Sequence, residues 1–186
     1  MREPTDKFTS GMADLYKQLF ASCRDKPMRV LEIGIFRGGS LWFWSDLFPH
    51  PETRIIGLDI RIPPFELPKN AAALVCDQND AARLRKIGED AGPFDLIVDD
   101  GSHFTAETRT CFQILFPFVG VAGHYMIEDW AVGYWKDRDP RFVGMVELVT
   151  DIISSAPAKQ IDAMQIFLHP GRALAVFRKG KEGWRA

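Results

Sequence analysis

Short apolar runs alternate with helical stripes along this chain, and this alternation limits the fold more than any other feature. Five runs have the character of buried strands, because they are short, apolar and bounded by glycine, proline or acidic residues. They cover residues 28–33, 54–60, 72–76, 95–98 and 121–127. Apolar residues with helical spacing occupy residues 12–23, 40–48, 79–87, 105–116 and 142–153. The pattern predicts an α/β, Rossmann-like doubly wound sheet with right-handed crossovers and helices on both faces.

The carboxyl-terminal part of the chain adds two more runs, residues 163–168 and 173–177, separated by a short turn. We expect these to form an antiparallel hairpin, which makes the sheet seven-stranded and mostly parallel. A length of 186 residues corresponds to one domain. We divide it into a helical lead-in (1–27), the main sheet (28–178) and a tail (179–186).

Charge, hydropathy and cysteine spacing exclude several classes of protein. The 23 basic and 25 acidic residues give a net charge of -2, so no strong field attracts nucleic acid or an anionic membrane. No apolar run is long enough to span a membrane, and the start MREPTDKF does not resemble a secretion signal. The 3 cysteines lack the spacing of a zinc site. We expect a cytoplasmic protein with reduced cysteines.

A glycine-rich corner joins the first predicted strand to the helix that follows it. Glu32, Gly34 and Gly38 precede Ser40, which can cap that helix. Bare backbone at a helix amino terminus lets a nucleoside ligand approach closely, and Asp59 at the end of the next strand can accept bonds from ribose hydroxyls. The spacing departs from the GxGxxG motif of dinucleotide binders. The alternative is that these glycines serve only the turn.

Other polar residues follow the third and fourth strands. Asp77 is a candidate for the adenine end of a nucleoside, although an aspartate in this position is also a common turn cap. Gln78 beside it is suited either to an adenine amine or to solvent. Asp99 is suited either to capping the next helix or to facing a bound cofactor.

Three carboxylates follow the fourth and fifth strands, which we expect to be neighbours. Asp100, Glu128 and Asp129 would repel one another at this edge unless a cation lies between them. Ligands that are all oxygen select a hard ion, so Mg²⁺ is the first choice, with manganese and calcium as alternatives. The competing interpretation is that these acids cap helices or bind loop amides.

His103 lies three residues after Asp100, where it can accept a proton from a bound hydroxyl. Without the neighbouring acids, a loop histidine is more often ordinary polar surface. The aromatic residues Trp130, Tyr134 and Trp135 follow the second acid pair. Their rings suit either a sugar or aromatic acceptor or a packing role against the core.

The segments EIGIFRGGS, GLDI, CDQ, FDLIVDDGSHF and YMIEDW occur in this order over residues 30–176. In sequence and order they resemble motifs of the class I S-adenosylmethionine-dependent methyltransferases. The resemblance is strongest to the macrocin and mycinamicin sugar O-methyltransferases and the cephalosporin-hydroxylase-like proteins.

This resemblance implies roles for individual residues. The acid and glycines that hold the methionine and sulfonium part of the cofactor correspond to Glu32, Gly34 and Gly38. The ribose acid corresponds to Asp59, and the adenine-side acid to Asp77. The magnesium ligands correspond to Asp100, Glu128 and Asp129, and the proposed base to His103.

The sequence therefore predicts an enzyme, a Mg²⁺- and S-adenosylmethionine-dependent O-methyltransferase. The methyl group would pass to a hydroxyl of a small molecule, a sugar or a glycosylated natural product, after His103 removes its proton. The alternatives are a nicotinamide-dependent oxidoreductase and a non-catalytic nucleoside-binding domain on the same fold. Because only residues 1–27 precede the first strand, we expect no larger amino-terminal domain over the acceptor pocket. The sequence leaves open which acceptor is used and whether subunits pair as a homo-oligomer.

Overall fold

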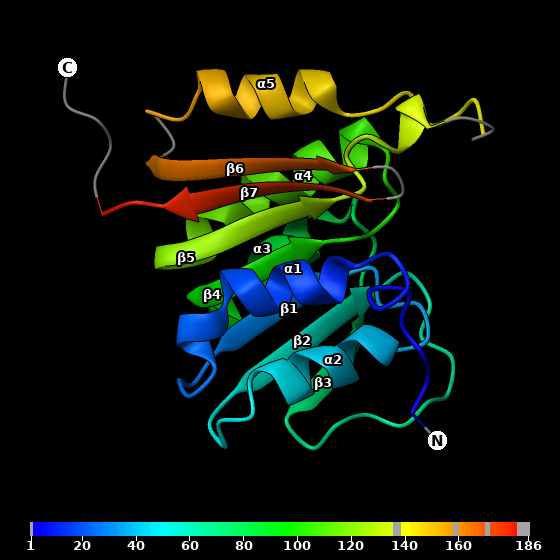
Figure 1. Ribbon diagram of the computed structural model, residues 1–186, viewed down its shortest axis with the longest axis vertical. Coiled ribbons are helices and arrows are strands. Elements are labelled where there is room, and N and C mark those ends of the chain that lie inside the picture. The colour runs from blue at the N-terminus through cyan, green and yellow to red at the C-terminus, as the bar shows by residue number, and fades with distance from the viewer. Residues whose placement is uncertain (1, 136–138, 158–159, 170–171, 182–186) are drawn as a thin grey trace.

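Seven strands form one mixed sheet with helices on both faces, as Figure 1 shows. The structure is a computed structural model that describes residues 2–135, 139–157, 160–169 and 172–181. The strands are β1 (Arg29–Ile33), β2 (Arg54–Asp59), β3 (Ala71–Val75), β4 (Phe94–Asp99), β5 (Val119–Glu128), β6 (Ile161–His169) and β7 (Arg172–Lys179). Their order across the sheet is β3-β2-β1-β4-β5-β7-β6. The predicted α/β, doubly wound fold is confirmed.

The parallel part of the sheet comprises β1 to β5, and the antiparallel part is the hairpin of β6 and β7. The second hairpin strand, β7, lies between β5 and β6 and is antiparallel to both. Most of the predicted tail, residues 182–186, lies outside the described residues.

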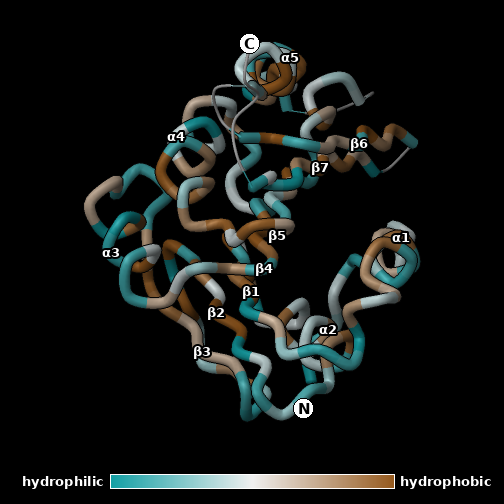
Figure 2. The backbone as a smooth tube through the Cα atoms, turned by 90° about the vertical axis from the view of Figure 1, so that its left-hand side faces the viewer, coloured by the Kyte–Doolittle hydropathy of each residue, from teal (hydrophilic) through white to brown (hydrophobic). Residues whose placement is uncertain are grey.

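The helices are α1 (Met12–Leu19), α2 (Gly39–Leu47), α3 (Ala81–Ala91), α4 (Thr105–Leu115) and α5 (Val146–Ser154). Viewed along the sheet, α1 and α2 cover one face and α3 and α4 cover the other (Figure 2). Alternate strand residues supply the two cores: in β4, Ile97 packs on the α3 and α4 side, whereas Leu96 and Val98 pack on the α1 and α2 side. No helix in the described ranges is long and apolar enough to cross a bilayer.

Three local predictions need correction. Ser40 does not cap α2: Gly38 is the N-cap residue, with a φ of 75°, and the Ser40 hydroxyl instead donates to Glu32. The helix predicted over residues 79–87 does not end there: α3 continues through Gly88, where a Cβ would come within 2.2 Å of the Phe118 ring, to Ala91. The apolar stripe from residue 142 does not begin a helix there. The ring of Phe142 stacks on Phe104 at 5.2 Å, and α5 begins only at Val146.

The strand register aligns the carboxyl ends of the central strands. Ile33 of β1 pairs with Leu58 of β2 on one side and with Asp99 of β4 on the other, and Asp99 in turn pairs with Ile127 of β5. After β1 the chain continues to β2 on one side of β1, whereas β4 pairs with the other side of β1. The strand order reverses direction at β1, which makes this the switch point of the sheet. Ligands of open α/β sheets bind in the crevice at such a point.

Candidate functional site at the carboxyl edge of the sheet

Two cavities open above these strand ends. The larger, of about 690 Å³, is lined by residues that include Gly34, Asp59, Gly101 and His103. The smaller, of about 350 Å³, lies toward β3 and contains Asp77 in its wall. Gly34, Asp59 and Gly101 line both cavities, so the two adjoin over the ends of β1, β2 and β4.

Gly34 brings two loops into direct contact at the floor of this site. Its φ is 85°, and a Cβ added there would lie 2.1 Å from the carbonyl oxygen of Asp100 and 2.6 Å from Cα of Gly101. A side chain is therefore excluded both by the backbone conformation and by the neighbouring chain. The glycine sets how closely the β1 loop approaches the loop that carries Asp100.

Asp59 ties the end of β2 to the turn after β1. Its Oδ2 accepts hydrogen bonds from the backbone N–H groups of Ile35 (3.1 Å) and Phe36 (2.8 Å), and its Oδ1 accepts one from Arg61 (3.1 Å). A carboxylate can accept about four hydrogen bonds, so capacity is left for a ligand in either cavity.

Gln78 connects the smaller cavity with the buried acid Asp99. Its Nε2 donates to Asp99 Oδ1 (3.0 Å), and its Oε1 accepts from the backbone N–H of Ser102 (2.7 Å). The Tyr125 hydroxyl donates to the other oxygen of Asp99 (3.1 Å). Burial raises the pKa of Asp99 to about 7. Asp77, at the cavity wall, accepts a hydrogen bond from the backbone N–H of Asn79.

Glu32 is completely buried beneath the larger cavity. Its Oε2 accepts a hydrogen bond from Ser40 Oγ (2.5 Å), whereas its Oε1 has no hydrogen-bond partner among the described residues. Burial raises the pKa of this carboxyl group, although Lys7 and Ser40 partly offset the effect. Ser40 itself forms part of the cavity wall.

The predicted metal ligands fall into two groups that meet at Asp100. Asp100, His103 and Asp129 present ligand atoms that all lie within 4.8 Å of one another, and all three residues are half-buried. Asp100 also forms such a group with the buried residues Glu32 and Glu128. The structure thus brings Asp129 and Glu128 each close to Asp100, but in two different groups.

Lys7 occupies the second group, and the sequence analysis did not identify it. Its Nζ lies 2.6 Å from Glu128 Oε1, 2.9 Å from Asp100 Oδ2 and 3.4 Å from Glu32 Oε1, and the residue is only 1% exposed. Tyr16 of α1 donates its hydroxyl to the same Glu128 oxygen at 2.6 Å. The sequence offered one chemical indication of such a residue. Several strand-end acids that are buried together require a cation, and the Lys7 ammonium supplies one.

The charges in this group shift one another's protonation. Burial opposes the charged form of Lys7, but the carboxylates of Asp100, Glu128 and Glu32 hold its pKa above the ordinary value. Burial raises the pKa of Asp100 to about 7 despite the nearby ammonium. Burial, followed by the charge of Asp100, raises the pKa of Glu128 to about 7 as well. One ammonium does not neutralise three carboxylates, so the group retains affinity for further positive charge.

His103 and the aromatic residues border the same edge. His103 lines the larger cavity, and its φ of 57° places its backbone in the left-handed region, which interrupts regular strand or helix geometry. Trp130, Tyr134 and Trp135 line a separate cavity of about 470 Å³. Trp130 directly follows Asp129 in the sequence. Trp130 is buried, whereas Tyr134 is 59% exposed, so the first packs and the second is accessible.

Comparison with known proteins identifies relatives of similar sequence. Mycinamicin VI 2''-O-methyltransferase from Micromonospora griseorubida is 40% identical over 190 residues, which cover 89% of this chain and 47% of the relative. The chain is a homologue of the class I sugar O-methyltransferases. Demethylmacrocin O-methyltransferase from Streptomyces fradiae is 34% identical, with the same coverage of 89% and 47%. No family model matches the chain.

A solved methyltransferase structure supports the same relationship. The MycE methyltransferase from the mycinamycin biosynthetic pathway, in complex with Mg and SAH, superposes with a TM-score of 0.80 at 30% identity. The match covers 100% of this methyltransferase homologue and 58% of the MycE chain. The chain spans about half the length of the curated relatives it matches. The resemblance predicted from the sequence is confirmed.

Proposed function

We propose that this chain is the catalytic domain of an S-adenosylmethionine-dependent O-methyltransferase that acts on a hydroxyl of a sugar or glycosylated small molecule. One observation carries the proposal: the larger of two adjoining cavities is lined by Asp100 and His103, which form a group of possible metal ligands with Asp129. The similarity to sugar O-methyltransferases supports it, and it does not favour the nicotinamide-dependent alternative. Residues 28–178 are the proposed catalytic unit, with 1–27 as the lead-in and 179–186 as the tail.

The proposed cofactor position follows from the polar groups around the two cavities. S-adenosylmethionine supplies an electrophilic methyl group on a sulfonium centre when it is bound. Asp59 has unused acceptor capacity for ribose hydroxyls, and Asp77 and Gln78 lie at the end that would receive the adenine. Because Gly34 and Gly38 have no side chains, the loop after β1 presents bare backbone at these two residues toward the proposed cofactor position. In this proposal, Glu32, Ser40 and Asp99 hold the loops that contact the cofactor in place. The side chains of the two acids determine the charge beneath those loops.

The residues present fit a divalent cation. Asp100 and Asp129 supply hard carboxylate oxygens beside the imidazole of His103, and the adjoining acids leave the region short of positive charge. Mg²⁺ at this position would act as a Lewis acid that lowers the pKa of an acceptor hydroxyl. Glu128, the third ligand expected from the sequence, is held by Lys7 and Tyr16.

His103 is the proposed general base. Its position in the wall of the larger cavity lets its imidazole accept a proton from a hydroxyl that enters there. The carboxylates of Asp100 and Asp129 beside it favour the imidazolium that this transfer produces. Tyr134 and Trp135 border the separate cavity of about 470 Å³ and are the proposed surface for the acceptor. Cys23, Cys76 and Cys111 are free thiols, which suits the proposed cytoplasmic location.

The proposal is tested in two stages. Isothermal titration with S-adenosylmethionine should show binding, and Asp59→Asn should weaken it because the ribose acceptor is reduced. A panel of sugars and glycosides is then incubated with enzyme and cofactor, and products are screened for a mass gain of one methyl group, with and without a chelator. Absence of cofactor binding contradicts the whole proposal, whereas turnover that ignores the chelator contradicts only the metal.

A further inference from the structure

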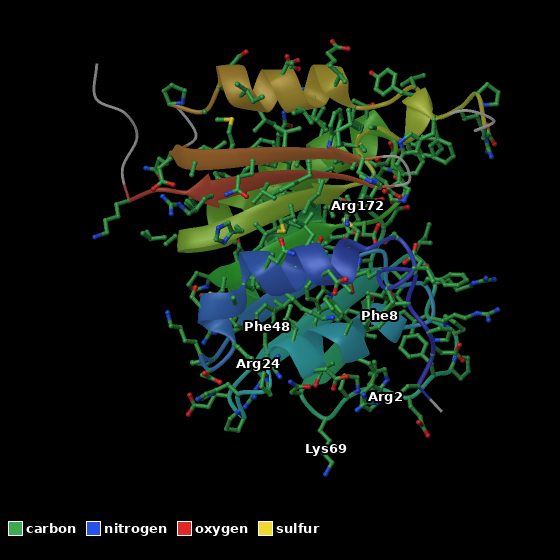
Figure 3. The ribbon with its side chains drawn as sticks, viewed as in Figure 1. Arg2, Phe8, Arg24, Phe48, Lys69 and Arg172 are labelled. Atoms are coloured by element: carbon green, nitrogen blue, oxygen red, sulfur yellow. The ribbon has the colours of Figure 1, made fainter. Side chains whose placement is uncertain are left out.

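The segment that precedes α1 lies at the carboxyl edge of the sheet, where the proposed cofactor position is. Side-chain contacts hold it at both ends. We define the amino-terminal segment as residues 2–11, with Arg2 and Phe8 labelled in Figure 3. At its start, Arg2 pairs with Asp46 of α2 at 2.8 Å. At its end, the carbonyl of Gly11 accepts a hydrogen bond from Arg172 at 2.7 Å, and Figure 3 shows Arg172 above α1.

This segment forms part of the wall of the larger cavity. Pro4, Thr5, Asp6 and Thr9 all line it, together with residues of the glycine-rich corner. The contact is close, since a Cβ added to Gly39 would lie 2.4 Å from the carbonyl oxygen of Pro4. Access to the proposed cofactor position therefore depends on where the amino-terminal segment lies.

Lys7 is the inward-pointing member of this segment, and its charge decides which carboxylates are left for a metal. Its ammonium is buried between Glu128 and Asp100, with Glu32 slightly farther away. Asp100 is also the residue shared with the group of His103 and Asp129. An ammonium and a divalent ion cannot share the same oxygens at contact distance, because the two cations repel and each needs those lone pairs.

We propose that Lys7 is a tethered cation that competes with the divalent metal for Asp100 and keeps Glu128 out of the metal site while the amino-terminal segment is closed. The proposal rests on the metal site proposed above. With the segment closed, Lys7 holds one oxygen of Asp100 as well as Glu128, so the metal is left with the other Asp100 oxygen and with Asp129. When Lys7 withdraws, Glu128 becomes available, and the segment that lines the cofactor cavity is released with it. Metal binding and access to the cofactor cavity are coupled in this way.

Metal affinity measured without cofactor or acceptor tests the competition. Isothermal titration with Mg²⁺ alone should show that Lys7→Met binds at least about tenfold more tightly than the natural chain, because a competing charge is removed and a carboxylate is freed. Lys86→Met is the matched control, since Lys86 forms an exposed pair with Asp90 on α3, and its affinity should change less than about twofold. Adding Glu128→Gln to Lys7→Met should abolish the gain.

A second measurement needs no variant, and so does not depend on how well Lys7→Met folds. The natural chain is treated with acetic anhydride, and acetylation of Lys7 and Lys86 is followed by mass spectrometry with and without saturating Mg²⁺. Lys7 should be modified at least about tenfold more slowly than Lys86 without the ion, because it is buried. Mg²⁺ should accelerate the modification of Lys7 alone.

Either of two results overturns the competition: Mg²⁺ affinity that is unchanged in folded Lys7→Met, or Lys7 protection that is unaffected by saturating Mg²⁺. Neither measurement involves methyl transfer. A failure of the proposed function would instead appear as absent cofactor binding or absent product, with the effect of Lys7 on metal affinity intact.

Discussion

Replacing Gly34 with alanine should damage both the stability of the fold and the geometry of the site. The position has a φ of 85°, and the added methyl group would lie 2.1 Å from the carbonyl oxygen of Asp100, with Gly101 Cα only 2.6 Å away. Both neighbours are backbone atoms, so no side-chain rotation relieves the overlap. The loop that carries Asp100 has to move.

The expected loss can be worked from these two effects. An L-residue in the left-handed region costs about 1–2 kcal/mol. Forcing a methyl group into a tightly packed position costs about 1–3 kcal/mol. Together they lower the unfolding free energy by about 2–5 kcal/mol, a large share of the roughly 5–15 kcal/mol typical of a domain. Because Asp100 moves, Mg²⁺ affinity should fall as well.

Urea denaturation followed by circular dichroism measures the loss, and Gly120→Ala in β5 provides the control. A Cβ on Gly120 would lie 3.4 Å from the Phe94 carbonyl oxygen, an ordinary contact, so its unfolding free energy should change by less than about 1 kcal/mol. If Gly34→Ala unfolds at the same urea concentration as the natural chain, the close approach of the two loops is refuted.

Three further outcomes are expected. His103→Ala should reduce the methyl-transfer rate by at least about 100-fold, because the base is lost, while isothermal titration shows S-adenosylmethionine affinity within about twofold of the natural chain. The pKa of Asp99 is raised to about 7, so the folded state holds a proton that the unfolded state releases near pH 4. Unfolding free energy should therefore fall by about 4 kcal/mol from pH 4 to 7 on account of this group, and Asp99→Asn should flatten that part of a urea-measured pH profile. Tyr16→Phe should lower the unfolding free energy in urea by about 1–3 kcal/mol, because the buried Glu128 loses a donor; an unchanged midpoint would contradict this.

The order of strands and helices could be predicted because each element is encoded locally. The apolar runs at residues 28–33 and 95–98 predict strands, and they correspond to β1 and β4. The expectation that acids collect at one edge also follows from local information, since the carboxyl ends of parallel strands share an edge. Asp59 and Asp100 both line the larger cavity at that edge.

Local patterns gave misleading answers where a distant contact decided the outcome. Ser40 suits a helix cap by its chemistry, yet the buried Glu32 requires its hydroxyl. Phe142 has the spacing of a helix, yet it packs on Phe104. Both residues satisfy a tertiary partner, which a window of neighbouring residues does not contain.

The sequence by itself determined the fold class and the set of acids, glycines and histidine at the carboxyl edge, because periodicity and strand-end position are properties of short segments. Only the tertiary structure decided how those acids are divided. Asp129 lies with His103 and Asp100, while Glu128 is turned toward Lys7. Lys7 is 121 residues from Glu128 in the chain and lies in a polar segment without periodicity. Burial of the carboxylates makes that distant ammonium necessary, and burial is set by the packing of the whole domain.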